Sequence, residues 1–260
     1  MPSRFLTPRL SALSVALALI SALAQAAPTT YFATQGPKAV LGNAAPPVLN
    51  AAMSGQLAAF NSDITALGRN EFESGVNAGP GSFNYIGGTA TLTGGNLVGV
   101  AQSPTPLGRY NMTSPVAADP FTGGVGYGHW LESSASFTYA FSTLISAIGF
   151  YGTDFGDLKG TFQLELYSGS GLVYSTSGIT NDGANKGNGN LLFYGIATDF
   201  GFDKAVFKIT QATGATSLDV LGFDSLIVGR ANTIPEPTSL ALTGLALVGA
   251  GFAARRTRRI

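Results

Sequence analysis

The sequence predicts an all-β fold: an antiparallel two-sheet sandwich, jelly-roll-like, with one short N-terminal helix. Beyond Arg69, short apolar or alternating runs are separated by clusters of glycine, asparagine and aspartate, which are typical of turns. At least eight such runs are present, enough for two packed sheets. No helical pattern lies between them, whereas a parallel sheet needs crossover helices.

The first 26 residues have the layout of a secretory signal peptide. Arg4 and Arg9 precede an apolar run at 10–23, and Ala24 and Ala26 form an A-x-A cleavage site. The run is short for a membrane-spanning helix, which needs about 20 apolar residues. We predict cleavage by signal peptidase after Ala26, so that the rest of the chain is exported.

The predicted domain covers residues 48–232 and follows a linker at 27–47. Its helix is expected at 48–60, because apolar residues recur there at steps of three and four without a proline. The clearest strand is Thr161–Ser168, in which apolar and polar residues alternate. The other predicted strands are Glu71–Ser74, Phe83–Ile86, Thr89–Leu92, Leu97–Val100, Ser136–Phe141, Ser146–Tyr151, Leu172–Ser175, Leu191–Ala197, Ala205–Gln211 and Leu218–Val228.

The C-terminal segment, 233–260, has three parts in a fixed order. Pro235, Glu236 and Pro237 come first, and an apolar stretch at 239–254 follows. The chain then ends in a basic tail at 255–260 that contains Arg255, Arg256, Arg258 and Arg259. Sixteen helical residues reach about 24 Å against a hydrocarbon core of about 30 Å, so we expect a marginal membrane helix with its basic end in the cytoplasm.

This segment resembles the PEP-CTERM sorting signal of Gram-negative bacteria. The resemblance implies that an exosortase, a membrane-embedded protease, cuts near Pro235, Glu236 and Pro237 after the chain has crossed the inner membrane. It also implies a protein held by one C-terminal helix and then placed at the cell surface or outside the cell, often among extracellular polysaccharide. The alternative is an ordinary C-terminal membrane anchor.

The composition excludes several kinds of site. The chain has no cysteine and one histidine, so it cannot form disulfides, thiolate zinc sites or multi-histidine metal centres. Setting aside two arginines of the leader, and four arginines and one glutamate of the tail, reduces the 14 basic and 14 acidic residues to 8 and 13. We expect no nucleic-acid partner, because such an acidic body has no basic runs.

A partial internal repeat suggests a ligand surface. The string FYGTDFG at 150–156 recurs as FYG at 193–195 and TDFG at 198–201. One interpretation is a paired loop surface at one end of the sandwich that binds polysaccharide. Its residues would be Tyr151, Asp154, Asp157, Tyr194 and Asp199, with Trp130 as a further stacking platform. The alternatives are two similar strand ends, since tight turns select aspartate and glycine, and burial of Trp130 in the core.

Three strings, at 72–74, 147–157 and 221–229, resemble the bodies of secreted PEP-CTERM proteins with lectin-like or carbohydrate-binding-module-like jelly rolls. In such modules the first and last strands pair near a structural calcium. That resemblance implies Glu73 and Asp224 as calcium ligands, with Asp219 as an extra one. Carboxylate oxygens suit calcium, although solvated carboxylates at strand edges explain Glu73 and Asp224 equally well.

No arrangement for catalysis is specific. His129 is the single candidate for a triad base, and no G-x-S-x-G nucleophile elbow occurs. Two carboxylates such as Asp154 and Asp157 could hydrolyse glycosides if correctly spaced, but a turn explains them as well. We therefore expect a non-enzymatic envelope or matrix protein that binds polysaccharide. The alternatives are a secreted glycan hydrolase and a structural surface protein without a small ligand.

Overall fold

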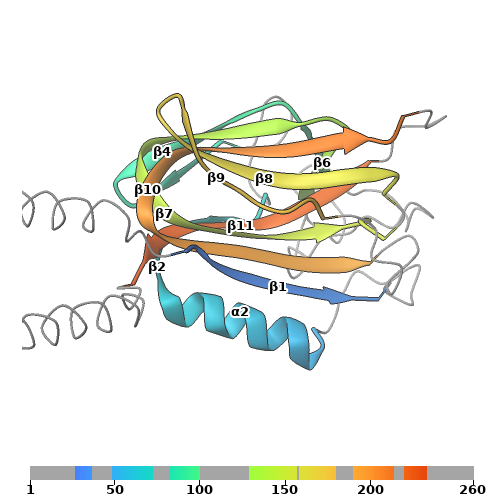
Figure 1. Ribbon diagram of the computed structural model, residues 1–260, viewed down its shortest axis with the longest axis horizontal. Helices are drawn as coiled ribbons and strands as arrows, with labels where there is room; N and C mark the ends of the chain where they lie inside the picture. Colours follow the sequence, from blue (N-terminus) through green and yellow to red (C-terminus); the bar gives the residue numbers. More distant parts are fainter. Residues whose placement is uncertain are drawn as a thin grey trace, which may run out of the picture. The chain divides into compact units, whose positions relative to one another are not determined.

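The computed structural model describes residues 27–36, 49–72, 82–99, 129–156, 158–179, 190–213 and 220–232. Within these ranges the chain forms β1 (Thr29–Gln35), α2 (Ala51–Asp63), β2 (Ile64–Asn70), β3 (Phe83–Tyr85), β4 (Gly88–Thr93), β5 (Asn96–Gly99), β6 (His129–Ser133), β7 (Phe137–Thr153), β8 (Gly160–Ser168), β9 (Gly171–Ser175), β10 (Leu191–Gln211) and β11 (Leu221–Ala231). The strands pair antiparallel in one hydrogen-bonded sheet (Figure 1). The prediction of an all-β antiparallel fold with one short helix is confirmed.

Two long strands organise the sheet, because their halves have different neighbours. Residues 191–197 of β10 lie between β1 and residues 147–153 of β7. After register shifts, residues 204–207 of β10 lie between β8 and the first part of β7, and residues 208–211 pair with β8. Irregularities of this kind bend a strand and increase its twist. Figure 1 shows β10 curving where its two halves meet.

An aromatic core joins the two halves of the bent strands. Phe150, from the second half of β7, lies 5.0 Å from Phe207 of β10 and 5.8 Å from Phe162 of β8, measured between ring centroids. Phe137, from the first half of β7, lies 4.8 Å from Phe223 of β11. Such pairs stabilise a core by about 0.5–1.5 kcal/mol each beyond the burial of their area. The sheet is therefore folded over its own apolar side chains.

A smaller core lies between α2 and the opposite face of the sheet. The helix begins after Asn50, whose Oδ1 accepts a hydrogen bond from the Met53 backbone N at 2.8 Å, as an N-cap residue does. Phe60 is fully buried, with its ring 5.4 Å from that of Tyr31 and 5.7 Å from that of Phe193. This core fastens the helix to β1, β7 and β10.

The structure corrects the predicted N-terminal boundaries. Residues 29–35, predicted as part of a linker, form β1 and pair with Leu191–Ala197 of β10. The compact unit accordingly begins at Pro28 and ends at Asn232. Glu71 and Phe72, the described part of the strand predicted at Glu71–Ser74, form no strand, because β2 ends at Asn70 and Phe72 has a left-handed φ of 58°; Glu73 and Ser74 lie outside the described residues. The helix begins at Ala51 and ends at Asp63, three residues later than predicted.

Among the residues that the structure describes, no helix is long and apolar enough to cross a membrane. The predicted signal peptide at 1–26 and the predicted membrane helix at 239–254 lie outside the described ranges.

Candidate functional site at the open edge of the sheet

A cavity of about 400 Å³ opens beside β1. Four separate segments form its walls: β1, the end of β9 with the residues after it, the turn after β7, and the start of β10. The lining residues are Thr30, Phe32, Thr34, Phe155, Gly156, Tyr174, Ser177, Gly178, Ile179, Asn190, Leu192 and Tyr194.

Strand alternation explains why β1 contributes to this cavity. Tyr31 and Ala33 are buried against the helix, so the residues between them face the other way. Phe32 is 43% exposed, and its ring centroid lies 5.9 Å from that of Tyr194. An apolar ring on an edge strand is thus available to a ligand that enters the cavity.

Tyr194 forms the deeper part of the aromatic wall. Its ring stacks on Phe150 at 6.0 Å between centroids. Burial raises the pKa of its phenol well above the usual range, Tyr174 adds to this effect, and a hydrogen bond with Thr176 opposes it. The Tyr194 hydroxyl is neutral at physiological pH, as an ordinary phenol is, and can donate a hydrogen bond.

Asn190 occupies the end of the cavity next to the turn that follows β7. Its Oδ1 accepts a hydrogen bond from the Gly156 backbone N at 2.6 Å, and its backbone O accepts one from the Asp154 N at 3.0 Å. Asp154 is buried and has a φ of 68°, a conformation that this pair of bonds holds in place. With Oδ1 engaged, the NH₂ group is the donor that Asn190 can offer to the cavity.

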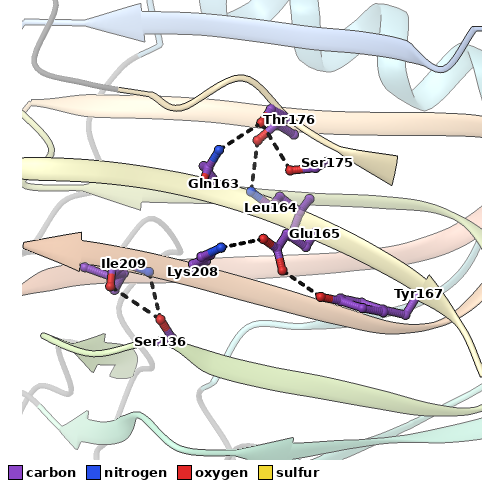
Figure 2. Close-up of polar contacts among 9 residues, drawn as sticks. All are labelled: Ser136, Gln163, Leu164, Glu165, Tyr167, Ser175, Thr176, Lys208 and Ile209. Carbon is purple, nitrogen blue, oxygen red and sulfur yellow. Dashed lines mark hydrogen bonds and ion pairs between the residues drawn. The ribbon is translucent and has the colours of Figure 1, made fainter. Parts of the chain in front are cut away.

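Hydrogen bonds to β8 hold the wall after β9. The Phe162 N donates to the Ile179 O at 2.9 Å, and the Ile179 N donates to the Phe162 O at 2.7 Å. Thr176 accepts at its Oγ1 from the Leu164 N at 2.9 Å and at its backbone O from the Gln163 Nε2 at 3.4 Å (Figure 2). This wall is therefore positioned before any ligand arrives.

The polar surface of β8 and β10, unlike the cavity lining, carries charged side chains. Glu165 accepts a hydrogen bond from the Lys208 Nζ at 2.8 Å and another from the Tyr167 hydroxyl at 2.8 Å (Figure 2). These bonds, with that from Lys208 the stronger, lower the pKa of the Glu165 carboxyl. The Lys204 Nζ lies 4.2 Å from the centre of the Tyr167 ring. The charges of this surface are thus engaged with one another.

The chemistry of the cavity suits a neutral, hydroxyl-rich ligand. None of the lining residues that the structure describes carries a charge. The lining combines aromatic and apolar side chains with hydroxyl groups and one amide, so it offers stacking surfaces together with donors and acceptors.

The predicted paired loop surface does not form. Residues 147–153 pair antiparallel with residues 191–197, so Asp154 and Asp199 lie beyond opposite ends of this paired stretch. Tyr151 is buried on the helix side, with its ring 5.4 Å from Phe193, whereas Tyr194 faces the other core. Tyr194 alone of these residues reaches the cavity, and Asp157 lies outside the described residues.

Trp130 is not an open stacking platform. Its side chain is 6% exposed, and its Nε1 donates to the Glu132 Oε1 at 3.0 Å. Trp130 is therefore buried, as the alternative interpretation of the sequence expected. The side chain of His129, named above as the sole candidate triad base, lies outside the described part of the chain.

Two of the three predicted calcium ligands, Glu73 and Asp219, lie outside the described residues. Asp224 is buried, not a solvated edge carboxylate, and its Oδ1 accepts from the Ser225 N at 2.6 Å. The Ser225 hydroxyl donates to the Glu71 Oε2 at 2.6 Å, and Glu71 also forms an ion pair with Arg69. Within the described ranges, no three acidic or histidine side chains gather as a metal site would require.

Sequence reasoning missed most of the cavity. Phe32 and Asn190 were not singled out, because one lay in a predicted linker and the other in a glycine–asparagine loop. The run TTYFAT at 29–34, rich in threonine and aromatic residues that favour strands, is the signal that could have identified β1 as a strand.

Comparison with known proteins places the C-terminal segment. Residues 233–259 match the PEP-CTERM protein-sorting motif. No curated protein matches the chain. The motif marks an exported surface protein that is targeted to exosortase, with a membrane-anchored C-terminal sorting signal of the kind found in Gram-negative bacteria.

Proposed function

We propose that this exported exosortase substrate binds a neutral polysaccharide at the cell surface, without catalysing a reaction, in the cavity beside β1. The observation that carries the proposal is the uncharged lining, in which Phe32 and Tyr194 supply aromatic faces and Asn190 supplies an amide. A sugar presents apolar C–H faces to such rings and hydroxyl groups to such donors and acceptors.

We infer that the body is a two-layer, jelly-roll-like sandwich. The inference rests on the bent strands β7 and β10, whose halves have different neighbours, and on the aromatic core between those halves. In such an architecture the cavity lies where edge strands leave the interior accessible.

We infer that two enzymes process the chain. Signal peptidase cuts after Ala26, and exosortase cuts near Pro235, Glu236 and Pro237. The basis is the order of leader, body, motif, apolar stretch and arginine cluster in the sequence. Until exosortase acts, the apolar stretch at 239–254 anchors the body to the membrane.

The competing function is glycan hydrolysis, which needs two carboxyl groups about 5–10 Å apart on either side of the scissile bond. The described lining of the cavity holds no carboxyl group, and this favours binding over hydrolysis. A structural surface protein without a small ligand is the third possibility, and the same experiment separates all three.

The test uses the exported body, residues 27–232, and affinity electrophoresis through gels that contain neutral or acidic polysaccharides. We expect retardation by a neutral glycan, and Phe32→Ala should weaken it roughly three- to tenfold through loss of one stacking contact. Leu172→Ala is the matched control, because Leu172 is 54% exposed on β9 but does not line the cavity.

Three outcomes would contradict the proposal. Release of reducing ends from the retarding glycan would favour the hydrolase. Equal losses in Phe32→Ala and Leu172→Ala would place binding elsewhere on the body. No retardation by any polysaccharide would leave the structural protein.

A further inference from the structure

The last residue of the body is held to the fold through its backbone N and both polar atoms of its side chain. The Asn232 N donates to the Asp63 O at 2.8 Å, and the Asn232 Nδ2 donates to the Ser62 O at 2.9 Å. Its Oδ1 accepts from the Thr65 Oγ1 at 2.9 Å. One residue earlier, the Ala231 N donates to the Ser146 Oγ at 2.8 Å. The folded body thus extends up to Asn232.

Asp63 joins this attachment to the first strand. Its Oδ2 accepts from the Tyr31 hydroxyl at 2.5 Å, and its Oδ1 accepts from the Ser62 Oγ at 3.0 Å. The end of α2, the start of β2, the first strand and the end of the last strand are therefore joined by hydrogen bonds around Asp63 and Asn232. We call the exposed residues here the exit face: Ser62, Asp63, Thr65, Arg230 and Asn232.

Asn232, the last residue of the exit face, lies very close in sequence to the sorting motif. Only Thr233 and Ile234 separate Asn232 from Pro235. Three residue steps of fully extended chain span about 11 Å, so Pro235 can never lie farther than that from the fixed Asn232. A protease that holds the motif in its active site must therefore bring its own surface against the exit face.

We propose that the exit face is the surface on which the sorting protease docks, so that exosortase reads the folded body together with the Pro-Glu-Pro motif. This proposal rests on exosortase processing but not on glycan binding. The face is polar, and its Asp63 carboxylate already accepts two hydroxyl hydrogen bonds. Arg230, paired with Thr65 in the register of β11 and β2, is its cationic group. The docking partner accordingly presents acceptors or negative charge to Arg230.

The test follows conversion of the full-length precursor to the mature form by pulse–chase in Gram-negative cells that carry an exosortase. We expect Arg230→Glu to slow conversion several-fold, because the reversed charge faces the docked partner. Lys159→Glu is the matched control, since it makes the same charge change at an exposed residue beside the start of β8. Both variants are checked for an unchanged Tm.

A second pair of variants carries an eight-residue Gly/Ser insertion between Asn232 and Thr233. The insertion removes the enforced contact, so Arg230→Glu and Lys159→Glu should then be converted at equal rates. Equal rates with the natural linker would overturn the proposal, and so would a deficit in Arg230→Glu that persists with the insertion. A wild-type precursor that is never cut would remove its premise. Glycan retardation of the same variants, expected to be unchanged, reports separately on the cavity.

Discussion

Two glycines beneath Phe60 decide how tightly the helix packs on the sheet. A Cβ added at Gly149 would lie 2.7 Å from the Phe60 Cε1, and one added at Gly195 would lie 2.8 Å from the Phe60 Cδ2. Gly149 and Gly195 are register partners on β7 and β10, so together they form the floor on which the ring rests. Because Phe60 is fully buried, its ring cannot move away without disturbing Tyr31 or Phe193.

We therefore expect Gly149→Ala and Gly195→Ala each to lower the free energy of unfolding by about 1–3 kcal/mol, the usual cost of overpacking a core. For a body of this size each kcal/mol corresponds to a fall in Tm of roughly 2–4 °C. The measurement is urea unfolding of the exported body followed by circular dichroism. Gly55→Ala is the control, because a Cβ there meets nothing within 4 Å and alanine is the better helix former.

A double-mutant cycle of Phe60→Ala and Gly195→Ala tests whether the Phe60 ring is what requires glycine at position 195. Phe60→Ala alone should cost about 3–5 kcal/mol. In that background the ring is gone, so Gly195→Ala should cost nothing or recover some stability. Full additivity of the two losses would show that the ring does not set the requirement for glycine, and a Gly195→Ala body as stable as the wild type would refute the packing argument altogether.

Three further predictions use the same unfolding assay. Asn190→Ala should cost about 1–3 kcal/mol by leaving the buried Gly156 N without its acceptor, and a variant as stable as the wild type would contradict this. Burial raises the pKa of Tyr151 to about 12, so the stability that its protonated phenol contributes is complete below pH 10 and is lost between pH 10 and 12. Tyr151→Phe should remove this part of the alkaline loss and leave the part due to Tyr31, Tyr139 and Tyr194, whose pKa values burial also raises; an unchanged pH profile would contradict the assignment. Asn232→Ala should cost about 1 kcal/mol through its lost hydrogen bonds, which equal stability of the variant and wild type would disprove.

The strands were predictable where their signal is local. Phe162, Leu164 and Leu166 alternate with polar residues, and β8 forms there with those three side chains buried. In β1 the apolar residues do not alternate, because Phe32 lies between Tyr31 and Ala33, and the strand was not predicted. Its stability comes from seven register pairs with β10, which no local pattern records.

The failure of the paired loop surface has a topological cause. Two similar strings suggest equivalent positions, but β7 and β10 run antiparallel, so the beginnings of the two copies pair with each other and their ends lead in opposite directions. In this register Tyr151 is partnered with Phe193, the neighbour of Tyr194, so Tyr151 and Tyr194 face opposite sides of the sheet. The two strings therefore lie side by side, but Asp154 and Asp199 lie at opposite ends of the paired stretch.

The sequence by itself determined the sorting signal and the fold class of this protein. The sorting motif at 233–259 is a contiguous string that its receptor reads directly, and strand alternation is a property of neighbouring residues. The tertiary structure alone decided the cavity and the exit face. Phe32, Asn190 and Tyr194 come together, as do Tyr31, Asp63 and Asn232, because strand register and the bend of the sheet are fixed by packing between segments far apart in the chain.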